Sequence, residues 1–320
     1  WMGIGFLFAA YSVIANDSVQ TLGTWIASNN ERVNWKVMWV AASSVLLWAL
    51  WYGWYMYGGD ISYGRLNKIP FQEIQWYHAL APGLLLLLTR IGVPVSTSFL
   101  VLSAFASTFV LEKMLMKSMM GYAVAAVAAY ALWLGITKIL DEDKPVKEEH
   151  KKYWRIGQWF TTGFLWWTWL SHDMANIMVF LPRYSSVPTL GFQILVVGMM
   201  LLGLAFMFYE RGGKIQEIVL TKTNTRYVRS ATLVDLVYVF VLYYFKEVND
   251  LPMSTTFVFM GMLAGREIGI IFAQGYGTLR YTNKNVKAIF PMLYSDFFRL
   301  MLGLAISVSL AYGIQWYSSL

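Results

Sequence analysis

Long apolar runs alternate with short polar stretches along the whole chain, and this pattern predicts membrane-spanning helices. Several runs, extended by their flanks, reach the ~20 residues that a helix needs to cross the hydrocarbon core of a bilayer. We count about ten such segments, at residues 2–15, 37–57, 74–89, 95–111, 119–140, 156–171, 189–209, 231–246, 253–274 and 289–317. The expected fold class is an all-α polytopic membrane protein.

The most charged stretch lies near the middle of the chain, at residues 141–155. Its sequence, DEDKPVKEEHKKYWR, combines charge with a proline and is typical of a linker. We therefore expect a first membrane repeat at residues 1–140 and a second at residues 156–320.

Two short motifs occur once in each of these units. The paired positions are 15–20 (ANDSVQ) with 171–176 (SHDMAN), and 94–99 (PVSTSF) with 252–257 (PMSTTF). The offsets are 156 residues (17 to 173) and 158 residues (94 to 252), and such nearly equal offsets indicate a duplicated unit. With about five segments in each unit, an odd number, the two units insert in opposite orientations. This is the inverted-repeat plan of many secondary transporters, which also contain broken or re-entrant helices.

Composition supports a location in the membrane. Of the 320 residues, 58% are hydrophobic and 13% are charged, against roughly 45–50% and 25% in a soluble domain. The net charge of +7 lies in short polar loops, so it indicates membrane topology and not nucleic-acid binding. The absence of cysteine excludes disulfides and thiolate metal sites. The chain opens at Trp1 within an apolar run, so we expect it to begin inside a longer protein.

The first motif places acidic and amide side chains inside apolar runs. A charge at the bilayer centre costs at least ~2.5–3.5 kcal/mol, so Asp17 and Asp173 should line a cavity or have partners. Because Asn, Asp and Ser favour helix caps, we interpret each motif as a break between two half-helices. The two carboxylates, with the amide oxygens of Asn16, Gln20 and Asn176, are hard ligands that suit a small cation such as sodium.

The second motif brings hydroxyl groups to the start of a helix. Proline is tolerated at the first helical position, and Asn249 and Asp250 are expected as caps before the second copy. The hydroxyl side chains expected in the first turns are Ser96, Thr97, Ser98, Ser254, Thr255 and Thr256. Hydroxyls and free N–H groups at the positive end of a helix dipole suit an anion, so two such helix starts would form a cradle for an oxyanion. A single motif of this kind is usually a structural kink, and its duplication favours a binding site.

Residues 253–274 also carry glycines at every fourth position, Gly261, Gly265 and Gly269. Small residues at this spacing let another helix approach closely, so we expect a packing face there and no ligand. Arg266 and Glu267 place two charges in the same apolar run.

The four motifs together resemble the signatures of the inorganic phosphate transporter (PiT) family, the sodium- or proton-coupled phosphate permeases that also include sulfate carriers. They stand here as IANDSVQTLGT (14–24), PVSTSF (94–99), LSHDMANIM (170–178) and PMSTTF (252–257). The sequence departs from the family signatures at Ile14, at Val19 and Gln20, at His172, and at Phe99 and Phe257, where the family has histidine.

The resemblance implies inverted repeats with a substrate site between them, coupling ions beside that site, and often a homodimer. By position, Asn16, Asp17, Asp173 and Asn176 correspond to ion and substrate ligands. Ser96, Thr97, Ser254 and Thr255 correspond to anion ligands.

These observations favour a secondary active transporter of inorganic phosphate with sodium as the coupling ion, working by alternating access in the plasma (inner) membrane. His172, next to Asp173, is a candidate proton or anion ligand, so a proton-coupled permease for sulfate or another oxyanion is an alternative. A receptor that keeps the fold without transporting is a second alternative. No nucleophile–base pair, metal cluster or Walker sequence is found, so we expect neither an enzyme nor a resident cofactor. The expected partners are phosphate, sodium, the lipid bilayer and a second copy of the chain, with no nucleic acid.

Overall fold

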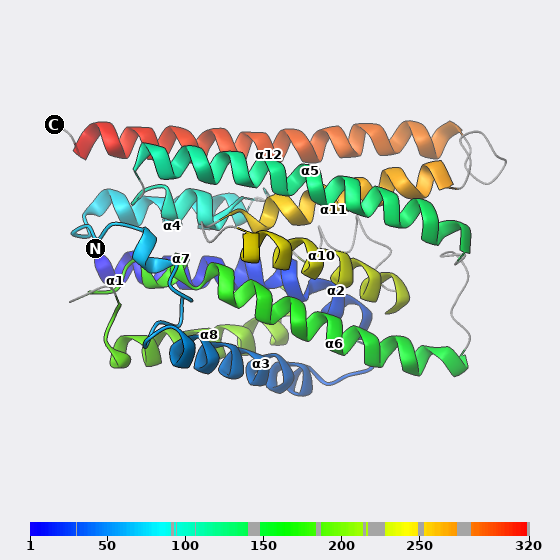
Figure 1. Ribbon diagram of the computed structural model, residues 1–320, viewed down its shortest axis with the longest axis horizontal. Helices are drawn as coiled ribbons and strands as arrows, with labels where there is room; N and C mark the ends of the chain where they lie inside the picture. Colours follow the sequence, from blue (N-terminus) through cyan, green and yellow to red (C-terminus); the bar gives the residue numbers. More distant parts are fainter. Residues whose placement is uncertain are drawn as a thin grey trace.

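The computed structural model describes residues 1–29, 31–90, 93, 95–105, 107–139, 148–183, 187–213, 216, 228–248, 253–273 and 283–318. Within these ranges the chain forms helices joined by turns, and no β-strand is assigned. Most of the helices run roughly along one common axis (Figure 1). The all-α fold class expected from the sequence is confirmed.

The helices fall into two successive sets. The first set comprises α1 (Met2–Ser12), the π-helical turn η1 (Val13–Ser18), α2 (Val19–Asn29), α3 (Trp35–Met56), the 3₁₀ turn η2 (Leu66–Lys68), α4 (Trp76–Arg90), the π-helical turn η3 (Ser98–Leu102) and α5 (Thr108–Ile139). The second comprises α6 (Glu148–Asp173), the short α7 (Ala175–Met178), α8 (Leu190–Tyr209), α10 (Val228–Val248), α11 (Thr255–Ala273) and α12 (Asn283–Ser318).

Seven helical stretches of the described chain are long and apolar enough to cross a bilayer. They are α1 with α2, then α3, α5, α8, α10, α11 and α12. Together with α4, η3 and the α6–α7 pair, they account for the roughly ten membrane segments expected from the hydropathy pattern. The chain is an integral membrane protein.

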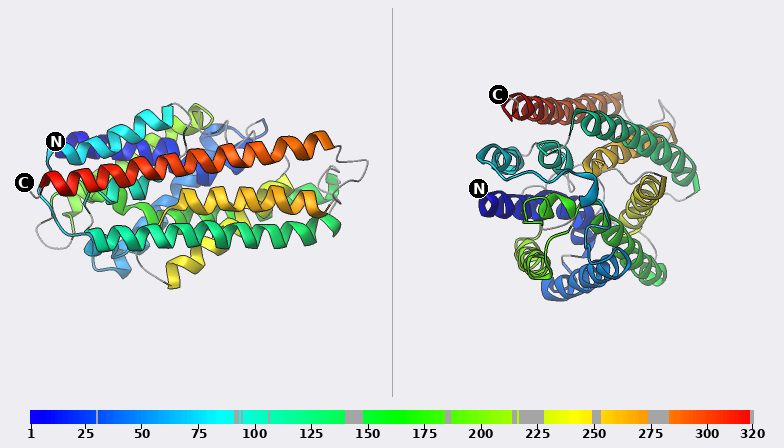
Figure 2. Two further views of the ribbon diagram at one scale, coloured as in Figure 1. Left: turned by 90° about the horizontal axis from the view of Figure 1, so that it is seen from above. Right: turned by 60° about the vertical axis from the view of Figure 1, so that its left-hand side comes forward.

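The packing of the first set recurs in the second. α1 packs on α4 as α6 packs on α10, and η3 packs on α12 as α11 packs on α5. α1 and α2 lead away from the end marked N in Figure 1, whereas α6 begins at the opposite end and runs back. Accordingly α4 lies toward one end of the molecule and α10 and α11 lie toward the other (Figures 1 and 2). The two sets have the inverted arrangement expected of the fold.

The exact limits of the repeats stay a prediction. Residues 140–147 of the expected linker lie outside the described residues, and residues 148–155 are the first turns of α6. We keep 1–140 and 156–320 as the proposed repeats, with the boundary between α5 and α6.

The segment expected at 95–111 is not one helix, and this prediction is wrong. The described residues there form η3, a turn at 103–105 and the start of α5, which continues without a gap to Ile139. Two of the charges between the expected segments, Glu112 and Lys113, are exposed on α5, and Lys113 Nζ lies 4.2 Å from the Phe109 ring centroid. A long lysine stem covers apolar surface while its charge stays exposed, so it does not end a helix.

The segment expected at 2–15 also continues, through η1 and α2 to Asn29. The hydropathy pattern did not predict α2 because this helix carries many polar residues. Several of these side chains form hydrogen bonds with other helices. Thr24 Oγ1 on α2 donates to Asp235 Oδ1 on α10 at 2.5 Å, and Thr162 Oγ1 on α6 donates to the other carboxylate oxygen. The polarity of α2 therefore reflects contacts inside the protein.

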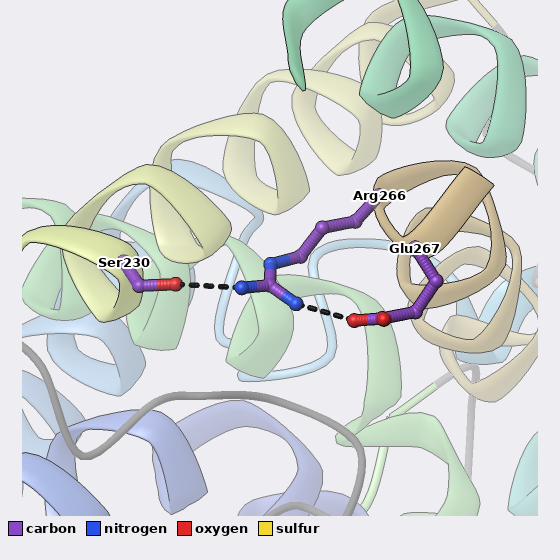
Figure 3. A network of polar contacts seen from close by, with 3 residues as sticks. All are labelled: Ser230, Arg266 and Glu267. Carbon is purple, nitrogen blue, oxygen red and sulfur yellow. Dashed lines mark hydrogen bonds and ion pairs between the residues drawn. The ribbon is translucent and has the colours of Figure 1, made fainter. Parts of the chain in front are cut away.

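A buried charged group ties α10 to α11 (Figure 3). Arg266 is 2% exposed, and its Nη1 donates to Glu267 Oε1 at 2.5 Å while its Nη2 donates to Ser230 Oγ at 3.0 Å. The guanidinium carbon also lies 5.6 Å from the ring centroid of Trp133 on α5. The two charges inside this apolar run are thus paired with each other, and the guanidinium contacts three helices.

The glycine face of α11 lies directly on the backbone of α5. A Cβ atom at Gly261 would lie 2.3 Å from the Tyr122 carbonyl oxygen, and one at Gly265 would lie 2.0 Å from that of Ala126. Backbone atoms cannot rotate away as the end of a side chain can, so glycine is required at both positions. The expected packing face is confirmed.

We predict that Gly265→Ala lowers the free energy of unfolding by about 1–3 kcal/mol, because α11 must move away from α5. Gly135→Ala, on α5 itself, is the matched control, since nothing lies within 4 Å of its Cβ position. The control should stay within ~1 kcal/mol of the wild type or be slightly more stable. Thermal unfolding in detergent measures both, and equal midpoints for the two variants would contradict the packing role.

Candidate functional site

Asn16 and Asp17 lie on η1, within the continuous helical span formed by α1, η1 and α2. The interpretation of this motif as a break between half-helices is therefore wrong. The helix continues because the Asn16 side chain has partners both within it and in the segment at residues 95–97. Asn16 Nδ2 donates to Asp17 Oδ1 at 2.6 Å, and also to the Val95 carbonyl at 3.0 Å and Thr97 Oγ1 at 3.3 Å. The π-helical turn is the local adjustment, of a kind that is frequent at functional sites.

Gln20 lies four residues after Asn16, on the same side of this helix. Its Nε2 donates to Asn16 Oδ1 at 3.0 Å. The hydrogen-bonding capacity of the Asn16 amide is therefore used on both its oxygen and its nitrogen. This orients the side chain and fixes the position of the Asp17 carboxylate beside it.

In the second copy the helix is interrupted at one residue, Met174, which itself keeps right-handed helical φ and ψ angles. α6 ends at Asp173, and the short α7 begins at Ala175. Asp173 Oδ1 accepts from Ser98 Oγ at 2.7 Å and from Asn176 Nδ2 at 3.0 Å, and the same nitrogen donates to Ser98 Oγ at 3.2 Å. Because Ser98 belongs to the first repeat, these bonds join the two halves.

The two Pro-Ser-Thr motifs begin their helices in the same way. Ser96 Oγ accepts from the Phe99 N–H at 3.1 Å, and Ser254 Oγ accepts from the Phe257 N–H at 3.2 Å. A side-chain oxygen bonded to the N–H three residues later is an N-cap. Both serines therefore precede the first turn, in which they were expected, and the threonine after each is the first helical residue.

This capping also corrects the roles expected of neighbouring residues. Pro94, Pro252 and the pair Asn249–Asp250 lie outside the described residues. With the serines as caps, the first helical position comes three residues after each proline and not on it. The cap of the second helix is Ser254 instead of the expected Asn249 or Asp250.

The Val95 carbonyl oxygen joins the two helix starts to the first motif. It accepts from Asn16 Nδ2 at 3.0 Å and from Thr256 Oγ1 of the second repeat at 3.3 Å. A backbone group thus acts as a shared acceptor for both halves. Nothing in the sequence of the motif distinguishes this position, because any residue there supplies a carbonyl.

The two carboxylates lie near each other at the centre of this cluster. Asp17 and Asp173 are each 1% exposed and are close enough for their charges to repel. Thr97 lies beside Asp17, and Thr255 lies beside Asp173. Each aspartate is therefore accompanied by the first helical residue of the capped helix from its own repeat.

Four buried oxygen atoms of the cluster have no hydrogen-bond partner among the described residues. They are Asp17 Oδ2, Gln20 Oε1, Asp173 Oδ2 and Asn176 Oδ1. All four can only accept, and leaving such a buried group unpaired costs about 1–3 kcal/mol, or more when it is charged. Carboxylate and amide oxygens are the ligands that hard cations prefer. The arrangement can therefore hold a small cation at either carboxylate.

All the site residues expected from the sequence are buried in this region. The residues with at most 4% exposure are Asn16, Asp17, Gln20, Ser96, Thr97, Ser98, His172, Asp173, Asn176, Ser254, Thr255 and Thr256. His172 lies in the last turn of α6, directly before Asp173. The structure thus brings the four motifs together, while the role of each residue as an ion or anion ligand stays a prediction.

Two further residues next to the site were not expected from the sequence. Arg65, between α3 and α4, is 3% exposed, and its Nε donates to the Ser171 carbonyl at 2.8 Å. Tyr238 on α10 donates its hydroxyl hydrogen to the Thr255 carbonyl at 3.1 Å. A cation in a polar connection is normally solvated, and a tyrosine in an apolar run is normally part of the core. Neither residue therefore carried a signal in the sequence.

No family model and no curated protein sequence matches the chain. Among solved structures, that of a sodium-dependent phosphate transporter is similar, with a TM-score of 0.60 at 15% identity. The alignment covers 99% of this chain and 98% of the other. At this identity the similarity establishes the fold alone. At that level it confirms the resemblance carried by the sequence motifs.

We predict that Ser254→Ala lowers the free energy of unfolding by about 1 kcal/mol, because the Phe257 N–H loses its acceptor. Ser254→Asn is the matched control, since asparagine is an equally good N-cap. Thermal unfolding in detergent compares the two. A Ser254→Ala protein as stable as the wild type would argue against the cap.

Proposed function

We propose that the protein is a secondary active transporter that carries inorganic phosphate across the membrane together with sodium. The observation that carries the proposal is the set of four unpartnered buried oxygens beside two capped helix starts. Carboxylate and amide oxygens suit a small hard cation, whereas hydroxyls and helix N-termini suit an oxyanion. The fold shared with a sodium-dependent phosphate transporter supports the same assignment.

The two ligands of this site depend on each other electrostatically. Like charges ~4 Å apart interact by about 4 kcal/mol at an effective dielectric constant of 20. An oxyanion near Asp17 and Asp173 is therefore repelled until cations bind there. Sodium at the two aspartates, with Asn16, Gln20 and Asn176 as further oxygen ligands, reverses this repulsion. Neither ligand binds well alone, which is the physical basis of symport.

The oxyanion is proposed to bind between the two capped helix starts. The hydroxyl groups proposed as its donors are those of Ser96, Thr97, Ser98, Ser254, Thr255 and Thr256, with the amides of Asn16 and Asn176 beside them. A tetrahedral anion needs donors from several directions, and two helices from opposite repeats supply them. At neutral pH phosphate can also donate a hydrogen bond, which sulfate cannot. The acceptors Asp17 and Asp173 therefore favour phosphate.

Transport follows from the position of the site between inverted repeats, whose relative movement exposes it to each side in turn. A net positive load that moves inward gains about 2.3 kcal/mol per charge for each 100 mV of membrane potential. We accordingly place the protein in the plasma (inner) membrane, where sodium and voltage gradients act on it. A homodimer is proposed on the resemblance to the PiT family.

A proton-coupled permease for sulfate or another oxyanion is the second candidate. The observation that favours it is His172, which is buried directly before Asp173. An imidazole next to a carboxylate can take the place of a coupling sodium by carrying a proton.

Uptake into proteoliposomes separates these candidates. Purified protein is reconstituted, and labelled phosphate uptake is followed with and without an inward sodium gradient and with sulfate as competitor. Sodium-dependent phosphate accumulation that sulfate does not inhibit is the expected result. Sulfate uptake driven by a proton gradient would support the second candidate. Uptake of neither anion would contradict both candidate functions.

We predict that Asp17→Asn and Asp173→Asn each reduce phosphate uptake at low sodium by at least about tenfold, because a neutral amide replaces a charged ligand of the cation. Glu112→Gln, at an exposed position of α5, makes the same change of charge away from the site and should leave uptake unchanged. Intact uptake by Asp17→Asn at low sodium would remove that residue from the ion site.

A further inference from the structure

The connection between α3 and α4 is a tightly organised loop built around Asp60. Its buried carboxylate accepts from the Ser62 N–H at 2.7 Å, the Ser62 hydroxyl at 2.6 Å and the Gly64 N–H at 2.9 Å. Tyr63 and Gly64 have φ angles of 58° and 73°. A tyrosine rarely adopts a positive φ, so this conformation depends on the contacts that surround it.

Contacts from both repeats hold this loop in place. The Tyr63 hydroxyl donates to the Ala49 carbonyl at 2.6 Å, and the ring occupies the space over Gly53, where a Cβ atom would lie 2.6 Å from it. From the second repeat, Arg183 Nη1 donates to the Leu66 carbonyl at 3.1 Å, and to the Ile69 carbonyl at 3.2 Å. The chain around Arg65 is therefore fixed on both sides.

Arg65 projects from this loop to the end of α6. Its Nε donates to the carbonyl of Ser171, two residues before Asp173, so the guanidinium lies at the negative end of the α6 dipole. Its positive charge also acts on the Asp173 carboxylate. A neutral donor would satisfy the Ser171 carbonyl equally well. Arginine adds a charge that is never lost by deprotonation.

The two aspartates of the site differ in the charged group that acts on each of them. Among the described groups, the charge that acts most on Asp17 is that of Asp173, whereas Arg65 acts on Asp173. The repeated motifs are similar in sequence, so the difference comes from a loop outside them. A cation bound at Asp173 would be repelled by the guanidinium, and an anion near it would be attracted.

We infer that Arg65 is the resident positive charge of the binding site. Its charge repels a cation at Asp173, so Asp173 is the weaker of the two cation sites. The same charge balances part of the negative charge of the oxyanion, which a further sodium ion would otherwise have to balance. Arg65 acts through Asp173 as a positioning residue and does not itself ligate the cation. This inference rests on the proposed function, and it concerns how many sodium ions accompany each phosphate.

Equilibrium binding of ²²Na⁺ and of labelled phosphate to purified protein in lipid nanodiscs tests the inference. Without phosphate, Arg65→Gln should bind sodium about tenfold more tightly than the wild type, because a repelling charge is gone. At fixed low sodium it should bind phosphate about tenfold more weakly, with recovery when sodium is raised. In proteoliposomes, the reversal potential should report an additional sodium per phosphate. Arg65→Lys keeps the charge and should stay near the wild type.

Arg183→Gln is the matched control, because it also removes a buried arginine that anchors the same loop. It should lower thermal stability and leave sodium affinity unchanged, whereas a purely structural role of Arg65 would give Arg65→Gln that same result. Unchanged sodium affinity in a folded Arg65→Gln protein, or a Lys variant that behaves like the Gln variant, would overturn the inference.

A charge-balanced pair of variants covers the case in which Arg65→Gln does not fold. Arg65→Gln/Asp173→Asn is compared with Asp173→Asn alone, and the tenfold change in sodium affinity should shrink to less than about twofold, since the charge has lost the group it acts on. A change of full size in this background would contradict the inference. If wild-type protein binds neither phosphate nor sulfate, the proposed function fails, while the sodium affinities still decide the role of Arg65.

Discussion

Two carboxylates buried among the helices set the requirements for the rest of the candidate site. An unpaired charge in a medium of low dielectric is very unfavourable, so Asp17 and Asp173 persist only where surrounding groups compensate them. Each has one oxygen that accepts hydrogen bonds from site side chains, from Asn16 in one case and from Ser98 and Asn176 in the other. The second oxygen of each lacks a partner in the described chain. Compensation is thus half complete, which is what a site for an exchangeable cation requires.

The bonds that compensate these charges also hold the two repeats together. Ser98 of the first repeat donates to Asp173 of the second, and Thr256 of the second donates to the Val95 carbonyl of the first. A cation at Asp173 would reduce the negative charge of the carboxylate and so weaken the hydrogen bond that Ser98 donates to it. A cation on the unpartnered oxygen of Asp173 and the contact with Ser98 would therefore share one carboxylate group. Under the proposed function this links the bound state of the site to the relative position of the halves.

Much of the fold follows from local patterns in the chain. Apolar runs predict α3, α8, α11 and most of α12, because a helix in lipid must be apolar over its exposed surface. The glycines of α11 predict a face on which another helix packs closely, and the structure shows that this helix is α5. α2 was not predicted, because Thr24 and its polar neighbours look like a loop when their partners are unknown. The missing gap before α5 has the same origin, since a lysine at a helix surface and one in a loop look alike.

For the candidate site too, some features could be predicted from the sequence and others required the structure. The sequence by itself determined that one acid motif and one Ser-Thr motif each occur twice, and the structure places all four copies together. Only the tertiary structure decided that η1 continues through Asn16, that Ser96 and Ser254 are caps, and that Arg65 is buried. Arg65 and the Ser171 carbonyl are 106 positions apart, so no local pattern contains their contact. Helix propensity and hydropathy act between near neighbours in sequence, whereas the burial of a charge depends on which distant segments surround it.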